Sequence, residues 1–149
     1  MTSPTKRALL ATAAALALFG CGVLPGSTTV NEITAVEEVP YQQFAAYQTG
    51  DMETAFSKLR VACQRWLGLS DFTATMKRRI AEIEEFVGSK LSDMRMRDVS
   101  VLSFTTGQVT LSVAVYLDDG TRVSDPAAER QEMIFEDGRW RVRDCLFGL

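Results

Sequence analysis

The side chains that could carry chemistry in this chain are few, and their types limit the reactions open to it. The chain has three cysteines, Cys21, Cys63 and Cys145, and no histidine. Without histidine there is no imidazole to act as a general base, to activate a serine or cysteine nucleophile, or to complete most zinc sites. The sequence also offers no matched set of acid, base and oxyanion donors. We therefore assign no catalytic residue and expect neither a metal nor a cofactor.

Cys21 ends a segment that has the three zones of a secretory signal. Lys6 and Arg7 supply positive charge, a run at 8–19 that is apolar except for Thr12 follows, and a small residue stands just before the cysteine. This run is shorter than the stretch of about 20 apolar residues that a membrane-spanning helix needs. Residues 1–20 are therefore predicted to be a signal peptide.

The segment Leu18–Cys21 (LFGC) resembles the lipobox of bacterial lipoproteins, which has an aliphatic residue three places before the cysteine and a small one just before it. Phe19 departs from that pattern, since its place usually holds a smaller residue. In that family the cysteine carries a thioether-linked diacylglycerol and the peptide before it is removed. The resemblance implies an envelope protein that is anchored by lipid on Cys21, on the extracytoplasmic side of a membrane. The alternatives are a secreted protein cleaved nearby and an uncleaved anchor helix.

If Cys21 takes the lipid, Cys63 and Cys145 remain as a pair outside the cytoplasm, where disulfides persist. A bridge between them would close a loop of roughly 80 residues and stabilise the fold by about 4–5 kcal/mol in the chain-entropy model. The alternative is two buried free thiols. We predict the bridge, because no reducing thiol pool protects an exported pair.

Size and charge restrict the mature chain further. Removal of residues 1–20 leaves 129 residues, the size of one domain with its own core. The balance becomes 14 basic against 19 acidic side chains, or −5, because Lys6 and Arg7 leave with the signal. A nucleic-acid-binding domain is usually net basic, so we expect no nucleic-acid partner.

Helical periodicity follows a short tether. Residues 21–39 contain Pro25, Gly26 and only scattered apolar side chains, and are expected to be flexible. Apolar residues then recur at helical spacing in three segments, which Gly50 and Gly68 separate. The expected helices run from Pro40 to Gly50, from the N-cap Asp51 to Leu67, and from Ser70 to Gly88.

From Met94 the apolar period changes to two, and residues 109–117 alternate as a half-buried strand does. Asp-Gly signals at 118–120 and 136–138 predict hairpins. The expected strands are 97–105, 109–117, 121–136 with an interruption at Asp125-Pro126, and a last strand around Trp140. Residues 40–149 are therefore predicted to form an α+β domain, with three N-terminal helices on one face of an antiparallel four-stranded sheet.

Two phrases in this order resemble the nuclear-transport-factor-2-like superfamily. Residues 44–56 (FAAYQTGDMETAF) look like its aromatic helix, Gly-Asp break and second helix, and residues 135–142 (FEDGRWRV) look like its last hairpin. With the order of helices and strands, the resemblance covers residues 40–145. It implies a curled sheet that forms a cone-like pocket with the helices. Some members are isomerases or dehydratases and others only bind ligands or partners, so the fold does not decide the function.

Few side chains in such a cone could transfer a proton. The possible pocket residues are Tyr41, Tyr47, Tyr116 and Asp144. Asp144 alternates in phase with Trp140 and Val142, which would turn its carboxylate inward, where burial raises a pKa. The simpler interpretation, which we expect, is a strand-end aspartate that is hydrated or paired with an arginine.

Arg139, Arg141 and Arg143 share one face of the last strand. Beside Arg95 and Arg97 they would present a positive patch to anionic lipid headgroups or to an acidic partner. The alternative, which we expect, is a solvated strand face that discourages edge pairing and is neutralised by glutamates of the neighbouring strand at 129, 132 and 136.

These patterns favour a binding or adaptor module of the cell envelope that holds an apolar small molecule or an envelope protein. One alternative is an isomerase- or dehydratase-like enzyme that uses Asp144 or a pocket tyrosine. Another is an accessory subunit whose sheet face docks on a larger envelope complex.

The lipid anchor predicts the outcome of a single substitution. Cys21→Ser removes the sulfur that would carry the diacylglycerol, so the variant should lose the acyl mass and leave the detergent phase. Phase partition and intact mass measure both effects. A Ser variant that still partitions like the parent protein would exclude lipidation at this position.

Overall fold

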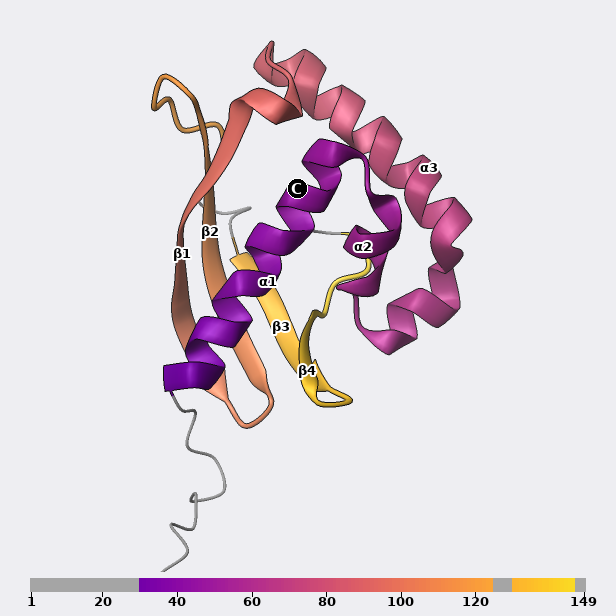
Figure 1. Ribbon diagram of the computed structural model, residues 1–149, viewed down its shortest axis with the longest axis vertical. Helices are drawn as coiled ribbons and strands as arrows, with labels where there is room; N and C mark the ends of the chain where they lie inside the picture. Colours follow the sequence, from indigo (N-terminus) through magenta and orange to yellow (C-terminus); the bar gives the residue numbers. More distant parts are fainter. Residues whose placement is uncertain (1–29, 125–129, 147–149) are drawn as a thin grey trace, which may run out of the picture.

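The computed structural model describes residues 30–124 and 130–146 (Figure 1). The predicted signal peptide, Cys21 and the first part of the expected tether lie outside these ranges, as does Glu129. The helical elements are α1 (Val30–Thr49), α2 (Met52–Ser57), α3 (Val61–Val87) and the 3-10 turn η1 (Leu91–Asp93). The strands are β1 (Met94–Thr105), β2 (Gln108–Leu117), β3 (Arg130–Glu136) and β4 (Arg139–Val142).

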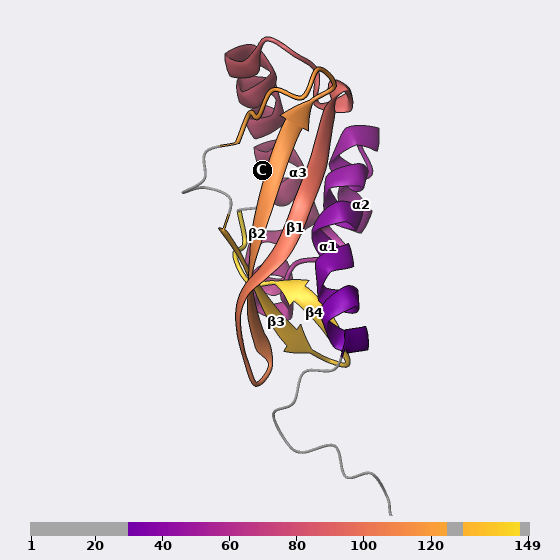
Figure 2. The same cartoon turned by 90° about the vertical axis from the view of Figure 1, so that its left-hand side faces the viewer.

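The strands form one open antiparallel sheet in the order β1-β2-β3-β4, and the helices precede it in the chain. This confirms the predicted α+β class and the strand order. Figures 1 and 2 show α1 lying across one face of the sheet, with α2 between α1 and the arch of α3. No helix in the described ranges has both the length and the apolarity that a membrane crossing requires.

The first helix begins ten residues earlier than expected, at Val30 rather than at Pro40. Residues 30–39 belong to the predicted tether, whose apolar side chains are scattered. Ile33, Val36 and Val39 nevertheless recur at helical spacing, and the last two are buried against the domain. This packing holds the helix together through Pro40, which has no amide hydrogen to give to the turn before it.

The second and third helices also divide at a different point. Helix α2 ends at Ser57, and residues 58–60 form a short link, with a turn at Lys58 and a bridge at Leu59, before α3 begins at Val61. Within this link Lys58 O accepts from Val142 N at 2.8 Å, and Arg60 N donates to Val142 O at 2.9 Å. Backbone pairing with β4 therefore replaces helical bonds here. Gly68, the expected helix end, only kinks α3, through a φ of 70°.

Local signals elsewhere match the structure. The side chain of Asp51 accepts from Thr54 N at 3.0 Å and caps α2, and Gly88 ends α3 in the left-handed conformation. Asp137 and Gly138 form the two-residue turn between β3 and β4, with φ of 50° and 77°. Strand β1 begins at Met94, three residues earlier than expected.

The core lies between the helices and one face of the sheet. Its helical side includes Phe44, Phe72 and Met76, and the sheet contributes Leu111 and Met133. Phe72 packs against Phe56 and Tyr47, with ring centroids at 5.2 and 6.4 Å.

A disulfide joins Cys63, near the start of α3, to Cys145, which follows β4, as the sequence predicted. Next to it, the Arg79 guanidinium donates to Leu146 O at 2.8 Å. The end of the described chain is therefore held on α3 by a covalent bond and by a hydrogen bond.

Reduction should destabilise the protein strongly, because a loop of about 80 residues is released in the unfolded state. We expect the free energy of unfolding to fall by about 4–5 kcal/mol. Urea unfolding with and without reductant measures this change. The double variant Cys63→Ala/Cys145→Ala is the control: its midpoint should be low and insensitive to reductant. A parent protein whose midpoint does not move on verified reduction would contradict the expectation.

Candidate functional site

A groove lies between the N-terminal half of α1 and the β3–β4 hairpin, with a volume of about 390 Å³. That volume is near the lower end of the range for small-molecule sites, about 300–1,000 Å³. The residues on the α1 side recur every three or four positions, so they share one face of the helix. The groove, called here the α1–hairpin groove, is lined by Glu32, Ala35, Val39, Gln42, Ser57, Lys58, Phe135, Gly138, Arg139 and Trp140.

The hairpin wall of the groove is an aromatic pair. Phe135 and Trp140 are cross-strand partners, and their rings meet edge to face with centroids 5.2 Å apart. They continue the row of buried partners Met133 and Val142 towards the turn. Phe135 is nevertheless 47% exposed. The wall is thus an extension of the core face that the helices do not fully cover.

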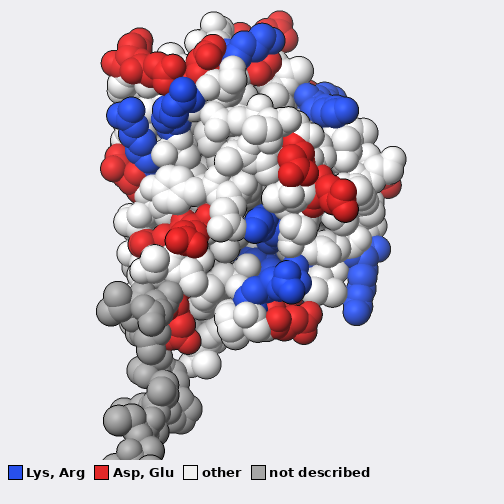
Figure 3. Space-filling model, in the orientation of Figure 1, with Lys and Arg blue, Asp and Glu red and all other residues white. Residues whose placement is uncertain are grey.

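Two basic side chains border this wall. Lys58 Nζ donates to Gln42 Oε1 at 2.6 Å, which joins the end of α2 to α1. Arg139 is exposed, and among the described residues its guanidinium has no ion pair. Figure 3 shows basic side chains gathered in the lower centre of this face, with acidic side chains directly below them and uncharged surface on the other sides. The groove therefore offers an apolar wall with a free cation at its edge.

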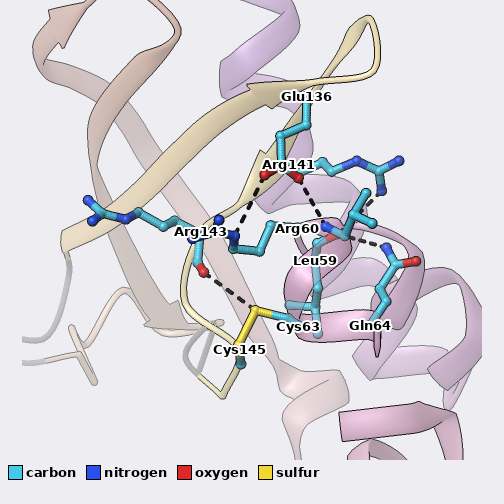
Figure 4. The surroundings of a disulfide bond; sticks show 9 residues. Leu59, Arg60, Cys63, Gln64, Glu136, Arg141, Arg143 and Cys145 are labelled. Carbon is cyan, nitrogen blue, oxygen red and sulfur yellow. Dashed lines mark hydrogen bonds and ion pairs between the residues drawn. A yellow bond between two sulfur atoms is a disulfide. The ribbon is translucent and has the colours of Figure 1, made fainter. Parts of the chain in front are cut away.

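The neighbouring carboxylate does not neutralise Arg139, because it serves another element. Glu136 pairs with Arg139 across the strands, but its side chain accepts from Val61 N at 3.0 Å and lies 3.6 Å from Arg60 Nε. Figure 4 shows this carboxylate turned towards the start of α3. It therefore caps α3 in place of a local residue, since Arg60 makes no side-chain cap bond.

The structure gives the three arginines of the predicted patch different surroundings. Arg141 is only 7% exposed, and its guanidinium donates to Ser57 O and Leu59 O at 2.9 and 3.3 Å. Arg143 forms an ion pair with Glu132 at 2.6 Å. Arg139 remains exposed at the groove. Of the basic row in the sequence, one side chain is thus left free for a ligand.

The possible pocket residues are not gathered at the groove, since none of them lines it. Tyr47 is buried in the core, and this burial raises the pKa of its phenol above the ordinary value. Tyr41 is exposed on α1, and Tyr116 donates its hydroxyl to Asp98 at 3.1 Å. Asp144 is half-buried beside the disulfide. Within the described ranges, no cluster of three or more acidic or cysteine side chains could hold a metal ion.

Sequence reasoning missed the groove because one of its walls was assigned to the tether. Ala35 and Val39 belong to the part of α1 that precedes Pro40. The signal that could have revealed this wall is the spacing of Ile33, Val36 and Val39. The other wall could not be foreseen, because only the strand register places Trp140 and Phe135 side by side at an open edge of the core.

Comparison with known proteins does not assign the chain to a group. No protein-family model matches it, and no curated protein shows significant similarity to it. The function is therefore argued from the geometry of the described residues.

The buried Tyr47 predicts a pH dependence of stability. In the unfolded chain its phenol ionises near pH 10, whereas burial keeps it neutral in the fold. The contribution of the neutral Tyr47 phenol to the free energy of unfolding is therefore complete below pH 10 and is lost as the pH rises above 10. From pH 9 to 11 the parent protein should lose about 1.4 kcal/mol more than Tyr47→Phe.

Denaturant unfolding at the two pH values measures this difference. Tyr41→Phe removes an exposed phenol from the same helix and should lose as much stability as the parent protein. Equal alkaline losses for Tyr47→Phe and Tyr41→Phe would show that Tyr47 ionises freely in the fold.

Proposed function

We propose that this protein is a lipid-anchored, non-catalytic binding module of the cell envelope, which holds an amphipathic small molecule in the α1–hairpin groove. The observation that carries the proposal is the aromatic pair of exposed Phe135 and half-buried Trp140, next to Arg139, which has no ion pair within the described ranges. Apolar walls with a few placed polar groups are typical of ligand sites. Such a groove suits a ligand with an apolar body and an anionic end.

The anchor and the export route rest on the sequence, through the signal-like segment and the LFGC phrase. The disulfide agrees with an oxidising compartment, since bridges of this kind persist outside the cytoplasm. The order of three helices and an antiparallel meander is compatible with a nuclear-transport-factor-2-like domain. In the proposed protein the ligand lies in the α1–hairpin groove, beside the core of this domain.

We propose that the protein is non-catalytic because of the kinds of side chains that line the groove. Catalytic acids and bases are usually found where burial or a charged neighbour shifts their pKa. Three carboxylates have a lowered pKa because each accepts hydrogen bonds at a helix end or turn, and none of them lines the groove. They are Asp51, Glu84 and Asp119, which accept from Thr54, Leu91 and Thr121, respectively. The enzyme alternative with Asp144 or a pocket tyrosine has no support from the groove.

Filling the groove tests the proposal. Ala35 and Ala45 are both exposed on α1, but only Ala35 lines the groove. Ala35→Trp should therefore displace the ligand, whereas Ala45→Trp should not. Native mass spectrometry of protein extracted from its own membranes would show the ligand as added mass beyond that of the anchor. We expect at least a tenfold lower occupancy in Ala35→Trp.

Once the ligand has been removed from both, the thermal midpoints of the two tryptophan variants should agree, which separates loss of the ligand from loss of the fold. Equal occupancy in both variants would place the ligand elsewhere. A parent protein that carries no small molecule and elutes with a protein partner would favour the adaptor function instead.

A further inference from the structure

We infer that one end of the domain lies on the bilayer that holds the anchor, so that the α1–hairpin groove opens onto lipid and takes an anionic membrane amphiphile as its ligand. This end, called here the hairpin end, consists of the start of α1 and the turns at 106–107 and 137–138. The inference rests on the proposed lipid anchor. It adds the orientation of the domain and the source of the ligand.

Three separate segments meet at the hairpin end. Phe135 N donates to Gly107 O at 2.9 Å, which ties the end of β3 to the β1–β2 turn. Glu32, in the first turn of α1, lines the same groove as Gly138 in the β3–β4 turn. Figures 1 and 2 show both turns beside the start of α1, away from η1 and the end of α3.

Exposed apolar side chains lie at or near the hairpin end, and two of them are on the core face of the sheet. Leu102 and Phe104 near the end of β1 are 52% and 53% exposed, and Phe135 is 47% exposed. Phe104 pairs with Val109, which pairs with Met133, so the register places Phe104 and Phe135 on one face of the sheet. Grouped exposed apolar residues mark an interaction surface, and aromatic rings are favoured at the interface between water and lipid.

The length of the chain before α1 selects the lipid as the partner of this surface. Nine residue steps separate Cys21 from Val30, and a fully extended chain of that length spans at most about 32 Å. Helix α1 has 20 residues and is itself about 30 Å long, at 1.5 Å per residue. A lipid on Cys21 therefore keeps the start of α1 near the bilayer, while the other end of the helix can lie a full helix length farther away.

The charges of the hairpin end fit a lipid headgroup region but do not dominate the contact. Arg139 and Lys58 have long aliphatic stems, which can lie along the aromatic wall while the cations reach phosphate or carboxylate oxygens. Glu32 opposes them across the groove. Asp137, in the β3–β4 turn, adds a second carboxylate, so these two cations and two carboxylates leave no net charge. The contact should therefore depend on ring burial and only weakly on salt.

The chain has two tryptophans, and they lie at different places in the fold. Trp140 lines the groove at the hairpin end, whereas Trp66 on α3 is 72% exposed. The full lipidated protein is placed in vesicles of zwitterionic lipid with 20% anionic lipid, with or without bromine on the acyl chains. Trp66→Phe, which retains Trp140, should lose at least half of its emission in brominated vesicles. Trp140→Phe, which retains Trp66, should lose little.

A second pair of variants tests whether the quenching of Trp140 depends on other side chains of the hairpin end or on Trp140 alone. In the Trp66→Phe background, Phe104→Ser should reduce the quenching of Trp140 at least twofold, because it removes a neighbouring membrane contact. Phe86→Ser is the control, since Phe86 is 90% exposed near the C-terminal end of α3. Equal quenching in these two variants would overturn the inference.

Flotation with the vesicles and intact mass separate the two proposals. A lipidated protein that floats without quenching of Trp140 keeps the anchor and overturns the membrane-facing hairpin end. A protein that carries no diacylglycerol and does not float overturns the anchor, and the orientation fails with it. A ligand that survives extraction but proves to be a water-soluble anion would contradict the membrane source alone.

Discussion

The fold depends on a seam between two segments that are far apart in the sequence, the α2–α3 link and β4. Leu59 pairs with Val142 in a parallel bridge, and the backbone bonds of Lys58 and Arg60 to Val142 secure it on both sides. Arg141 donates to the carbonyls before and within the link, Glu136 caps the helix after it, and the disulfide follows one helical turn later. Ser57 and Lys58 line the groove from one side of this seam, and the aromatic wall belongs to the other side. The seam therefore fixes the shape of the groove.

The seam also explains why two of the three arginines at 139, 141 and 143 are held by other groups of the protein. A buried guanidinium needs acceptors inside the protein, and Arg141 Nη1 donates to two carbonyl oxygens that the interrupted helix leaves open, whereas its Nε has no partner among the described residues. Arg143 is held by Glu132 on the adjacent strand. Arg139 stays free because Glu136, its cross-strand neighbour, is used at the start of α3. Among these three arginines, only Arg139 is therefore left to bind a ligand within the described part of the chain.

Features that depend on nearby residues could be predicted from the sequence. Asp51 caps α2 because its side chain reaches an amide three residues on, and the Asp137-Gly138 turn follows from backbone preferences of those two residues. The break at 58–60 could not be predicted in this way, because no glycine or proline marks it. It exists because Val142, more than 80 residues later, offers it backbone partners. The groove required both the early start of α1 and the register of β3 with β4, so it escaped prediction as well.

The sheet is open, yet neither of its edges offers another chain a long straight strand. The α2–α3 link covers β4, while β1 has register shifts between Arg97 and Ser100 and between Val101 and Ser103, with Asp98 at a φ of 55°. Bulges of this kind twist an edge and interrupt its row of backbone donors and acceptors. Proteins confined to a membrane surface meet one another far more often than proteins in free solution. For a protein held at a membrane in the proposed way, edges of this kind hinder strand pairing between neighbouring molecules. The molecules can then crowd on one surface and stay separate.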